Sequence, residues 1–377
     1  MCEITIEQLL DLPESTYMLC DIRDSISYSY GTIPGAENIS NLIEQADKGL
    51  LPADKKIILF CMHGTQSIDP CEELRDLGYE AYSLSGGYAS WLKKQLIKTD
   101  RSFEIEESLQ NKRKFKEKLF NPFARAIVQY KLVEPGDRIA VCISGGKDSM
   151  LMAKLFQQLQ RHRKFPFELV FLVMDPGYNE LNRKLIENNA EMLGVPIRIF
   201  ESSIFDAVYT IDKSPCYLCA RMRRGHLYSK AKELGCNKIA LGHHFDDVIE
   251  TTLMGMLWGG QIQGMMPKLR SANFEGMELI RPMYFVREDD IKAWRDYHGL
   301  HFIQCACHFT DTCSSCREDG AAVSKRMETK LLIRHLKETN PNVEINIFNS
   351  INNVCLDTLI AYKQKGETHH FLDTYKD

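Results

Sequence analysis

The sequence has no long hydrophobic run. No apolar stretch is longer than residues 169–174, which is far below the ~18 residues that a membrane-spanning helix needs. Residues 1–7 contain neither a basic segment nor an apolar one, so no export signal is visible. These two absences predict a soluble, cytoplasmic protein without a membrane partner.

Positive charge is not in excess either. The chain has 47 Lys and Arg against 51 Asp and Glu, a net charge of −4. This balance excludes a globally basic nucleic-acid-binding protein, although a local patch can still bind phosphate. The basic run at residues 112–118 is more typical of a solvated helix face. Contact with RNA phosphates is the alternative for this run and for Arg221, Arg223 and Arg224.

Cysteine, by contrast, is plentiful. The chain has 13 cysteines in 377 residues, and without an export signal this number favours thiol chemistry or metal binding over a disulfide scaffold. The rest of the composition, 44% hydrophobic and 26% charged, is that of a globular protein. The length is enough for two or three domains.

Two segments show their own alternation of strands and helices. In the first, buried strands are predicted at residues 17–22 and 56–61. A shift to charged composition marks a linker before the second segment. The predicted divisions are a small parallel-sheet domain, a linker, a larger α/β domain and a polar C-terminal tail, at residues 1–97, 98–111, 112–360 and 361–377.

The larger domain has the pattern of a doubly wound parallel sheet. Its strands are predicted at residues 138–143, 168–174, 197–200 and 238–241, with helical stretches between them. Ligands of such sheets bind at the carboxyl ends of the strands. The expected fold class is therefore α/β, with one small and one doubly wound parallel-sheet domain.

A glycine-rich loop directly follows the strand at residues 138–143 and precedes a predicted helix at 150–159. It consists of Ser144, Gly145, Gly146, Lys147, Asp148 and Ser149. Adjacent glycines let the backbone approach an anion, and a helix N-terminus offers free N–H groups to phosphate. The loop resembles the SGGxDS pyrophosphate loop of the PP-loop ATP pyrophosphatases. This resemblance implies binding of ATP with Mg²⁺ and cleavage to AMP and pyrophosphate.

Polar residues also follow two further predicted strands. Asp175 follows the strand at 168–174, and Gly242, His243 and Asp247 follow the strand at 238–241. Carboxylates at strand ends can hold Mg²⁺ or orient a reacting group. The run at 242–247 resembles the GHHxDD element of one PP-loop branch. The resemblance implies nucleotide contacts for Gly242 and His243, and catalytic roles for Asp175 and Asp247.

Several of the cysteines have the spacing of metal ligands. Cys216 and Cys219 form a C-x-x-C pair. Such a pair is compatible with zinc, with an iron–sulfur cluster or with redox chemistry, and the spacing by itself favours zinc slightly. Four more cysteines follow later in the chain, at Cys305, Cys307, Cys313 and Cys316.

The order and spacing of these motifs resemble the tRNA 2-thiocytidine synthetases over residues 112–359. The shared elements include the C-x-x-C pair, the Arg-Arg-Gly run at 223–225 and the Ile-Arg-Pro run at 280–282. The resemblance reverses the preference for zinc. It implies a [4Fe–4S] cluster with three cysteine ligands and an open iron site that could carry sulfur, and zinc becomes the alternative.

The cluster ligands carry over only in part. Cys216 and Cys219 match the family motif, whereas the family's second C-x-x-C is replaced here by Cys305-Ala306-Cys307. We expect Cys305 or Cys307 as the third ligand. Cys313 and Cys316 remain open as a resolving pair, a small zinc site or bystanders.

A second candidate sulfur site lies in the small domain. Cys61 begins a loop, residues 61–67, directly after a predicted strand. Such a loop can aim successive N–H groups at one sulfur and stabilise a thiolate or persulfide. Together with the turn at 31–36 and the glycines at 86–87, it resembles a rhodanese domain over residues 5–95. The resemblance implies that Cys61 carries a persulfide.

The loop departs from the common rhodanese pattern at two positions. Gln66 stands where many rhodaneses have arginine, and Thr32 stands where they have histidine. Without a fixed cation near the sulfur, an anionic donor such as thiosulfate is a poor fit. An inactive rhodanese fold used for docking is the alternative. The remaining cysteines are expected as buried or incidental thiols: Cys2, Cys20, Cys71, Cys142, Cys236 and Cys355.

Together the resemblances imply a tRNA sulfurtransferase. Cys61 would accept sulfur from a cysteine desulfurase or another donor. The PP-loop domain would adenylate the C2 oxygen of an anticodon-loop cytidine, position 32 of tRNA in the family, and sulfur relayed through the cluster would replace that oxygen. The alternatives are a tRNA uridine thiolase, a PP-loop enzyme that forms another bond, and an inactive ATPase with a sulfur-sensing rhodanese module. A homodimer is expected from the family only.

Overall fold

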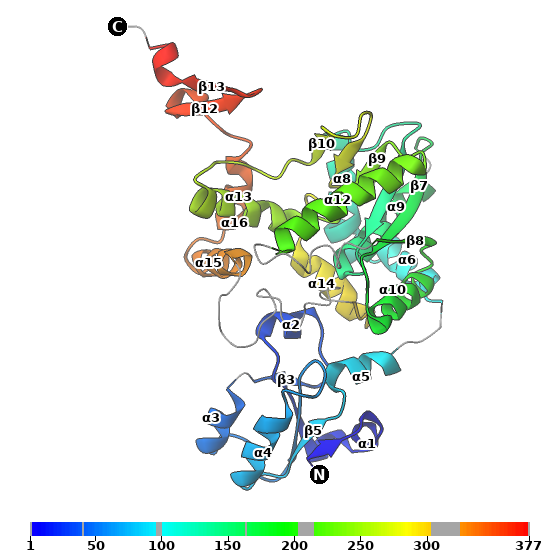
Figure 1. The fold of residues 1–377 in the computed structure, drawn as a ribbon, viewed down its shortest axis with the longest axis vertical. Coiled ribbons are helices and arrows are strands. Elements are labelled where there is room, and N and C mark those ends of the chain that lie inside the picture. Colours follow the sequence, from blue (N-terminus) through cyan, green and yellow to red (C-terminus); the bar gives the residue numbers. More distant parts are fainter. Residues whose placement is uncertain are drawn as a thin grey trace. The chain divides into compact units, whose positions relative to one another are not determined.

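The structure, a computed structural model, describes residues 2–39, 41–95, 100–162, 164–202, 215–302 and 325–375, without the side chains of residues 26 and 215–221. The chain divides into two compact units (Figure 1). One unit comprises Met1–His243 and Pro267–Ala322, and the other comprises His244–Met266 and Val323–Asp377. Among the described residues, no helix is both long enough and apolar enough to cross a membrane.

The N-terminal part of the first unit contains a five-stranded sheet in the order β1-β5-β4-β2-β3. Every strand pair in it is parallel. The strands are β1 (Glu3–Ile4), β2 (Tyr17–Asp21), β3 (Glu37–Asn38), β4 (Lys56–Phe60) and β5 (Ala81–Leu84). The helices are α1 (Ile6–Leu10), α2 (Ser25–Tyr30), α3 (Leu42–Asp47), α4 (Ile68–Asp76) and α5 (Gly87–Lys94). The strands predicted at 17–22 and 56–61 therefore correspond to β2 and β4.

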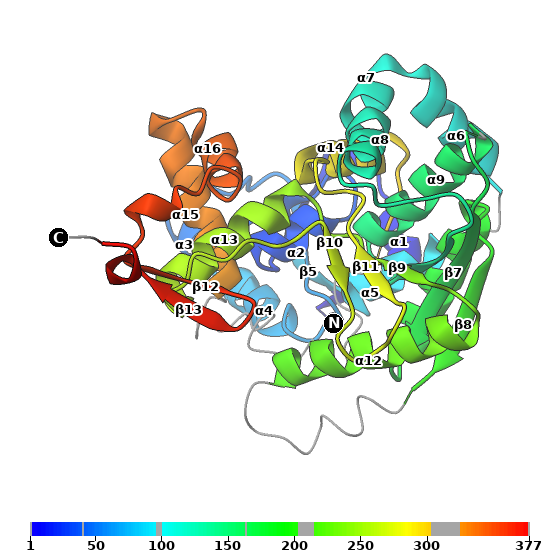
Figure 2. The ribbon, with the colours of Figure 1, turned by 90° about the horizontal axis from the view of Figure 1, so that it is seen from above.

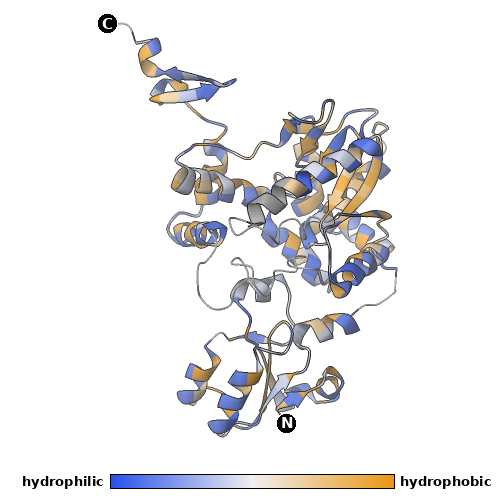
Figure 3. Cartoon of the chain, viewed as in Figure 1, coloured by the Kyte–Doolittle hydropathy of each residue, from blue (hydrophilic) through white to orange (hydrophobic). Residues whose placement is uncertain are grey.

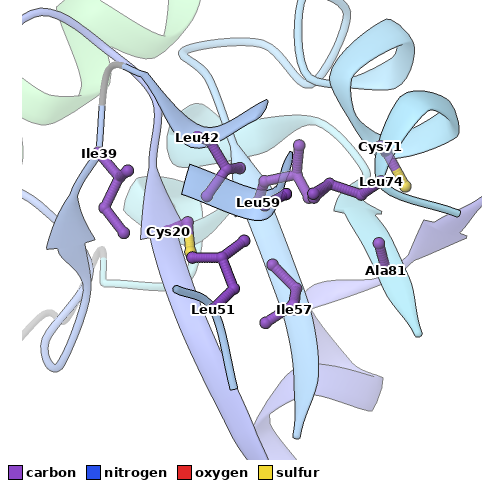
Figure 4. Close-up of a cluster of buried hydrophobic side chains, with 10 residues drawn as sticks. Cys20, Ile39, Leu42, Leu51, Ile57, Leu59, Cys71, Leu74 and Ala81 are labelled. Atoms are coloured by element: carbon purple, nitrogen blue, oxygen red, sulfur yellow. The ribbon is translucent and has the colours of Figure 1, made fainter. Parts of the chain in front are cut away.

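The core of this part lies around β4. Four consecutive residues of β4, from Ile57 to Phe60, are fully buried, as expected for a central parallel strand that is covered on both faces. Ile57 and Leu59 share one face and pack with Leu51 and Leu74 (Figure 4). At about 25 cal/mol per Å² of buried apolar surface, such side chains dominate the stability of a small sheet.

The larger part of the first unit contains a six-stranded sheet in the order β10-β11-β9-β6-β7-β8. All of its neighbouring strands are parallel except the β10–β11 pair. The strands are β6 (Arg138–Ile143), β7 (Glu168–Asp175), β8 (Ile197–Glu201), β9 (Lys238–Ala240), β10 (Lys268–Arg270) and β11 (Glu278–Ile280). Successive strands run outward from β6 through β7 to β8, and the chain then returns to β9 on the other side of β6. The gap between β6 and β9 is therefore the topological switch point, where ligands of such sheets bind.

Helices cover both faces of this sheet (Figure 2). Tyr228 and Ala231 of α12 pack against Ala140 and Cys142 of β6, whereas α9 lies on the opposite face. The strands form an apolar layer between these helices (Figure 3). The helices of this part are α6 (Ser102–Asn111), α7 (Arg113–Phe115), α8 (Asn121–Gln129), α9 (Lys147–Arg161), α10 (Glu180–Met192), α12 (Pro215–Glu233) and α14 (Glu288–Tyr297). The expected α/β class, with a doubly wound parallel sheet, is confirmed.

Much of the segment predicted as a linker, residues 98–111, is helical and packed. It contains α6, in which Ile105 and Leu109 are buried. The carboxylate of Glu106 is held by Lys154 of α9, with a distance of 2.7 Å from Nζ to Oε1. A π turn at Lys116–Phe120 separates α7 from α8.

The second unit is mainly helical. It contains α13 (Phe245–Gly259), α15 (Lys325–Thr339) and α16 (Val343–Ser350). Phe245 of α13 stacks on Phe348 of α16, with ring centroids 4.5 Å apart. The range 361–377, predicted as a polar tail, contains an antiparallel hairpin of β12 (Ala361–Gln364) and β13 (Glu367–His370).

Candidate active site

The loop of residues 144–149, called here the phosphate loop, joins β6 to α9 at the switch point. Gly145 has a φ of +85°, a conformation that glycine adopts without strain. The Ser149 hydroxyl closes the loop, since it accepts from the Ser144 N–H (3.1 Å) and donates to the Gly146 carbonyl (3.0 Å). Gly146 occupies the N-cap of α9 without a capping side chain, so the amides of the first turn can face a phosphate.

Lys147, the first residue of α9, is buried and paired with two carboxylates. Its Nζ lies 3.1 Å from Asp148 Oδ2 and 3.4 Å from Glu288 Oε1 of α14. Burial would lower the pKa of Lys147, but the nearby carboxylates outweigh burial and the net pKa is raised above its ordinary value. The lysine is therefore held as a cation beside the phosphate loop.

Gly242 follows β9 and lies against the first turn of α9. A Cβ at this position would be 3.2 Å from Ser149 N and 3.3 Å from the carbonyl carbon of Asp148. These are backbone atoms of α9, so the segment after β9 approaches the start of α9 as closely as a glycine allows. The structure thus brings Gly242 to the phosphate loop. The next residue, His243, is the last residue of the segment Met1–His243 of the first unit.

Asp175, at the end of β7, orders its own loop. Its Oδ1 accepts hydrogen bonds from the N–H groups of Gly177 (2.9 Å) and Tyr178 (2.7 Å). Its Oδ2 lies 2.8 Å from Arg183 Nη1. These contacts are those of a loop anchor, and the catalytic role of Asp175 stays a prediction.

Asp247 lies in the second unit, in the first turn of α13. It forms a capping box with His244: Asp247 Oδ2 accepts from His244 N (3.0 Å), and His244 Nδ1 accepts from Asp247 N (3.4 Å). The His-x-x-Asp spacing inside the GHHxDD element thus has a structural reason, because such a box satisfies the free amides at a helix start. The catalytic role of Asp247 stays a prediction.

A buried carboxyl lies one turn beyond Asp247. Burial raises the pKa of Glu250 to about 7, although nearby Arg326 and Lys330 lower it. Arg326 of α15 bridges the two acids, with 3.3 Å from Nη2 to Asp247 Oδ1 and 3.2 Å from Nε to Glu250 Oε2.

The candidate cluster ligands lie mostly outside the described residues. The backbones of Cys216 and Cys219 belong to the first turns of α12, and an i, i+3 spacing places both on one helix face. Their side chains, and Cys305, Cys307, Cys313 and Cys316, are outside the described part of the chain.

Cys61 lies at the end of β4 and its side chain is buried. The Gly64 N–H points at its sulfur, with 3.1 Å from N to Sγ. The N-terminal amides of α5 hold the same loop from the other side, since Tyr88 N donates to Cys61 O and Ala89 N donates to Met62 O, both at 2.9 Å. A Cβ on Gly87 would be 2.4 Å from Cys61 O, so this glycine is required for the close approach.

The substitution at Thr32 has a clear structural consequence. Thr32 Oγ1 donates to Asp21 Oδ2 (2.6 Å), and the same buried carboxylate pairs with Arg23 (2.6 Å). The Arg23 guanidinium lies 4.1 Å from the centroid of the Tyr88 ring and donates to Gly31 O. Thr32 therefore supports a buried network under α5, whereas Gln66 is exposed.

Two of the cysteines expected as incidental thiols form a disulfide. Cys2 and Cys71 are joined, which ties the residue before β1 to α4. The expectation was wrong for this pair because residues far apart in sequence meet beside β5. Burial raises the pKa of Cys20 and of Cys142 to about 12 each, so these two are unreactive thiols as expected.

Sequence patterns missed two buried carboxylates, one in each unit. Glu288 reaches Lys147 from a helix far along the chain, and no local motif marks it. Glu250 follows Asp247 at helical spacing on a buried face, which a helical projection of residues 245–259 could have indicated.

Comparisons with known proteins identify two family matches. The PP-loop domain model matches residues 110–309, and the rhodanese-like domain model matches residues 5–94. The tRNA-cytidine(32) 2-sulfurtransferase of Paraburkholderia phytofirmans is 34% identical over 69% of this chain and 75% of its own length. The enzyme of the same name from Syntrophotalea carbinolica is 36% identical over 61% of this chain and 86% of its own length.

Among solved structures, the U34-tRNA thiolase NcsA of Methanococcus maripaludis, solved with its [4Fe–4S] cluster, is similar at 20% identity. The match covers 63% of this chain and 78% of that chain, with a TM-score of 0.49. The PP-loop model covers more than half of the chain, and both sulfurtransferases are matched over more than two thirds of their length. The chain therefore belongs to the PP-loop family of the tRNA-cytidine(32) 2-sulfurtransferases.

Proposed function

We propose that this protein uses ATP to replace the C2 oxygen of cytidine 32 in tRNA with sulfur. The observation that carries the proposal is the phosphate loop at the β6–β9 switch point, in a chain whose family members bear this enzyme name. The rhodanese-like part supports the sulfur chemistry, because it presents a cysteine in a loop whose amide points at the sulfur.

In the first step, the C2 oxygen of the base attacks the α-phosphorus of ATP. The bond between the α-phosphorus and the bridging oxygen breaks, and pyrophosphate leaves. The first-turn amides of α9 and the Lys147 cation would stabilise the charge on the phosphates. A sulfur nucleophile then adds at C2, the C–O bond breaks, and AMP leaves.

We propose that the sulfur is first carried on Cys61. The Cys61 thiolate attacks the outer sulfur of a donor persulfide, such as that of a cysteine desulfurase, and the donor thiol leaves. The carried sulfur is at the sulfane level, so two electrons are needed before it can become the sulfur of a thiocarbonyl. A thiol reductant supplies them and is oxidised to a disulfide.

The cysteine set fits an iron–sulfur cluster by its donor chemistry. Cys216 and Cys219, on one face of α12, would hold a [4Fe–4S] cluster together with Cys305 or Cys307. Such a cluster, when bound, would supply an open iron site for sulfide. Metal analysis of anaerobically purified protein tests this part, and zinc without iron would contradict it.

The experiment for the whole proposal is mass spectrometry of tRNA nucleosides from cells with and without the gene. We expect that 2-thiocytidine is the thionucleoside lost from cells without the gene, that the other thionucleosides are unchanged, and that the wild-type gene restores 2-thiocytidine. Loss of a thiouridine would show a uridine thiolase, and an unchanged set of thionucleosides would contradict tRNA thiolation.

Two point variants in the same strain test the roles of the PP-loop part and the rhodanese-like part separately. Lys147→Ala should abolish 2-thiocytidine, because the phosphates lose their cation. Cys61→Ala should reduce it strongly, whereas Cys20→Ala, a buried thiol of the same sheet, should not. Full 2-thiocytidine in Cys61→Ala would support a docking role for the rhodanese-like part.

A further inference from the structure

The Cys61 loop ends in a serine whose hydroxyl does not cap the helix that follows. Ser67 is the N-cap residue of α4, yet its side chain makes no capping hydrogen bond. Its backbone is already helical, with φ −86° and ψ −2°, whereas a capping serine normally has an extended backbone. The usual capping hydrogen bond of a serine at this position is therefore not made here.

The Ser67 hydroxyl instead faces the sulfur of Cys61. Ser67 Oγ lies 3.7 Å from Cys61 Sγ and 2.8 Å from the hydroxyl of Ser83 on β5. Ser83 Oγ lies 3.5 Å from the carbonyl oxygen of Gly64. Both serines are fully buried, so water does not satisfy these hydroxyls.

We propose that Ser67 and Ser83 form a neutral hydroxyl pair that stabilises the anionic sulfur of Cys61. The pair would act in place of the loop cation that Gln66 does not provide. The inference rests on the proposed function only in that an anionic Cys61 is the form that accepts sulfur. In this scheme Ser67 contacts the reacting sulfur directly, and Ser83 is a positioning residue that acts through Ser67.

The two hydroxyl protons can follow the charge on the sulfur. When Cys61 carries its proton, Ser67 donates to Ser83, and Ser83 donates to Gly64 O. When the sulfur is anionic, Ser83 turns its proton to Ser67 Oγ, and Ser67 donates to Cys61 Sγ. Only two C–O bonds rotate, and a hydrogen bond to the charged form favours that form.

Variants of these serines remove hydroxyls and change no charged group near the sulfur. Gly64 N–H donates to the sulfur in any case. The titratable or charged groups of the adjoining segments include His63 in the loop, Asp69 in the first turn of α4, Tyr88 of α5, and the Asp21–Arg23 pair at the end of β2. Variants of Ser67 and Ser83 leave all of them in place.

The test measures alkylation of Cys61 by iodoacetamide between pH 5 and 10 in the full chain, with peptide mass spectrometry to isolate Cys61 from the other cysteines. Ser67→Ala should move the pH midpoint of alkylation upward by about one unit, which is about a tenfold loss of thiolate below the midpoint. Ser83→Ala should move it in the same direction by less. Ser67→Thr keeps the hydroxyl and should restore the wild-type midpoint.

Ser90→Ala is the matched control. The Ser90 hydroxyl donates within the same domain, to Ser85 O and Gly87 O, and does not contact the sulfur. An unshifted midpoint in Ser67→Ala, or an equal shift in Ser90→Ala, would overturn the proposal. If Ser67→Ala unfolds, the alkylation profiles of Ser83→Ala and Ser67→Thr test the proposal instead. An unshifted midpoint in Ser83→Ala, or a midpoint in Ser67→Thr that differs from wild type, would then overturn it. No tRNA, ATP or donor is present, so this result is independent of whether Cys61 supplies sulfur to tRNA.

Discussion

Lys147 Nζ lies 3.4 Å from Glu288 Oε1, and this ion pair joins the first residue of α9 to the first residue of α14. Both side chains are almost completely buried. A buried cation needs such a partner, because an unpaired charge in the interior is costly. The pair therefore fixes the side chain of Lys147 within the phosphate loop.

Glu288→Gln should weaken this arrangement while keeping the shape of the side chain. Asp148 still holds Lys147, so we expect a loss of about 1–3 kcal/mol in the free energy of unfolding and a several-fold higher KM for ATP. Denaturant unfolding and AMP formation with tRNA measure the two effects. Glu180→Gln, which removes an exposed pair with Lys184, is the control, and equal behaviour of the two variants would refute the role of Glu288.

Gly242→Ala should impair nucleotide binding through a backbone shift. The new Cβ would press on backbone atoms of Asp148 and Ser149 at 3.2–3.4 Å, so the start of α9 must move by a few tenths of an ångström. We expect about tenfold weaker ATP binding, or about 1.4 kcal/mol, measured by calorimetry. Gly225→Ala is the comparison, because its Cβ meets nothing within 4 Å. Equal ATP affinity in both variants would show that the close approach is unimportant.

Glu250 should make the stability depend on pH. Burial raises its pKa to about 7 in the folded chain, from an ordinary value of 4.5. The folded state therefore binds more protons than the unfolded state between these values, and the contribution of Glu250 is lost as the pH rises from about 4.5 through 7. Glu250→Gln removes this dependence, so it should gain stability relative to wild type between pH 5 and 8, by at most about 3 kcal/mol.

Denaturant unfolding of both chains at pH 5, 6, 7 and 8 measures that difference. Glu338→Gln is the control, since Glu338 is exposed beside His335. A stability difference between Glu250→Gln and wild type that stays constant across this range would contradict a raised pKa for Glu250.

The Cys2–Cys71 disulfide should be detectable and stabilising. Non-reducing digestion should yield one linked peptide that contains both cysteines. The bridge closes a loop with a sequence separation of 69, for which chain entropy predicts about 4 kcal/mol of stabilisation as an upper estimate. Under oxidising conditions, Cys2→Ser should have a free energy of unfolding that is lower by this amount and equal to that of reduced wild type. Cys355→Ser removes an exposed free thiol and should leave the free energy of unfolding unchanged. Absence of the linked peptide after air oxidation would contradict the pairing.

Local segments of the sequence predicted most of the fold. β6 and β7 are continuous apolar runs between polar turns, and their positions were predictable from the amino-acid sequence alone. The phosphate loop and the Cys61 loop were also recognisable, because each is one contiguous segment between a strand and a helix. The hairpin at 361–370 was missed because its short strands have no apolar face that stands out from a polar tail.

Pairs that are distant in sequence could not be predicted. Glu288 with Lys147, Ser83 with Ser67, and Cys2 with Cys71 each join different elements. No local pattern contains both members of such a pair, so their meeting depends on how helices and strands pack.

The sequence by itself determined the two parallel-sheet parts, the phosphate loop and the cysteine that begins the second loop, because backbone propensity and apolar periodicity act over short stretches of chain. Tertiary structure alone decided which carboxylate holds Lys147, how tightly Gly242 approaches Ser149, and which hydroxyl faces Cys61. Those relationships arise only when side chains from separate elements are buried together and must satisfy one another's charges and hydrogen bonds.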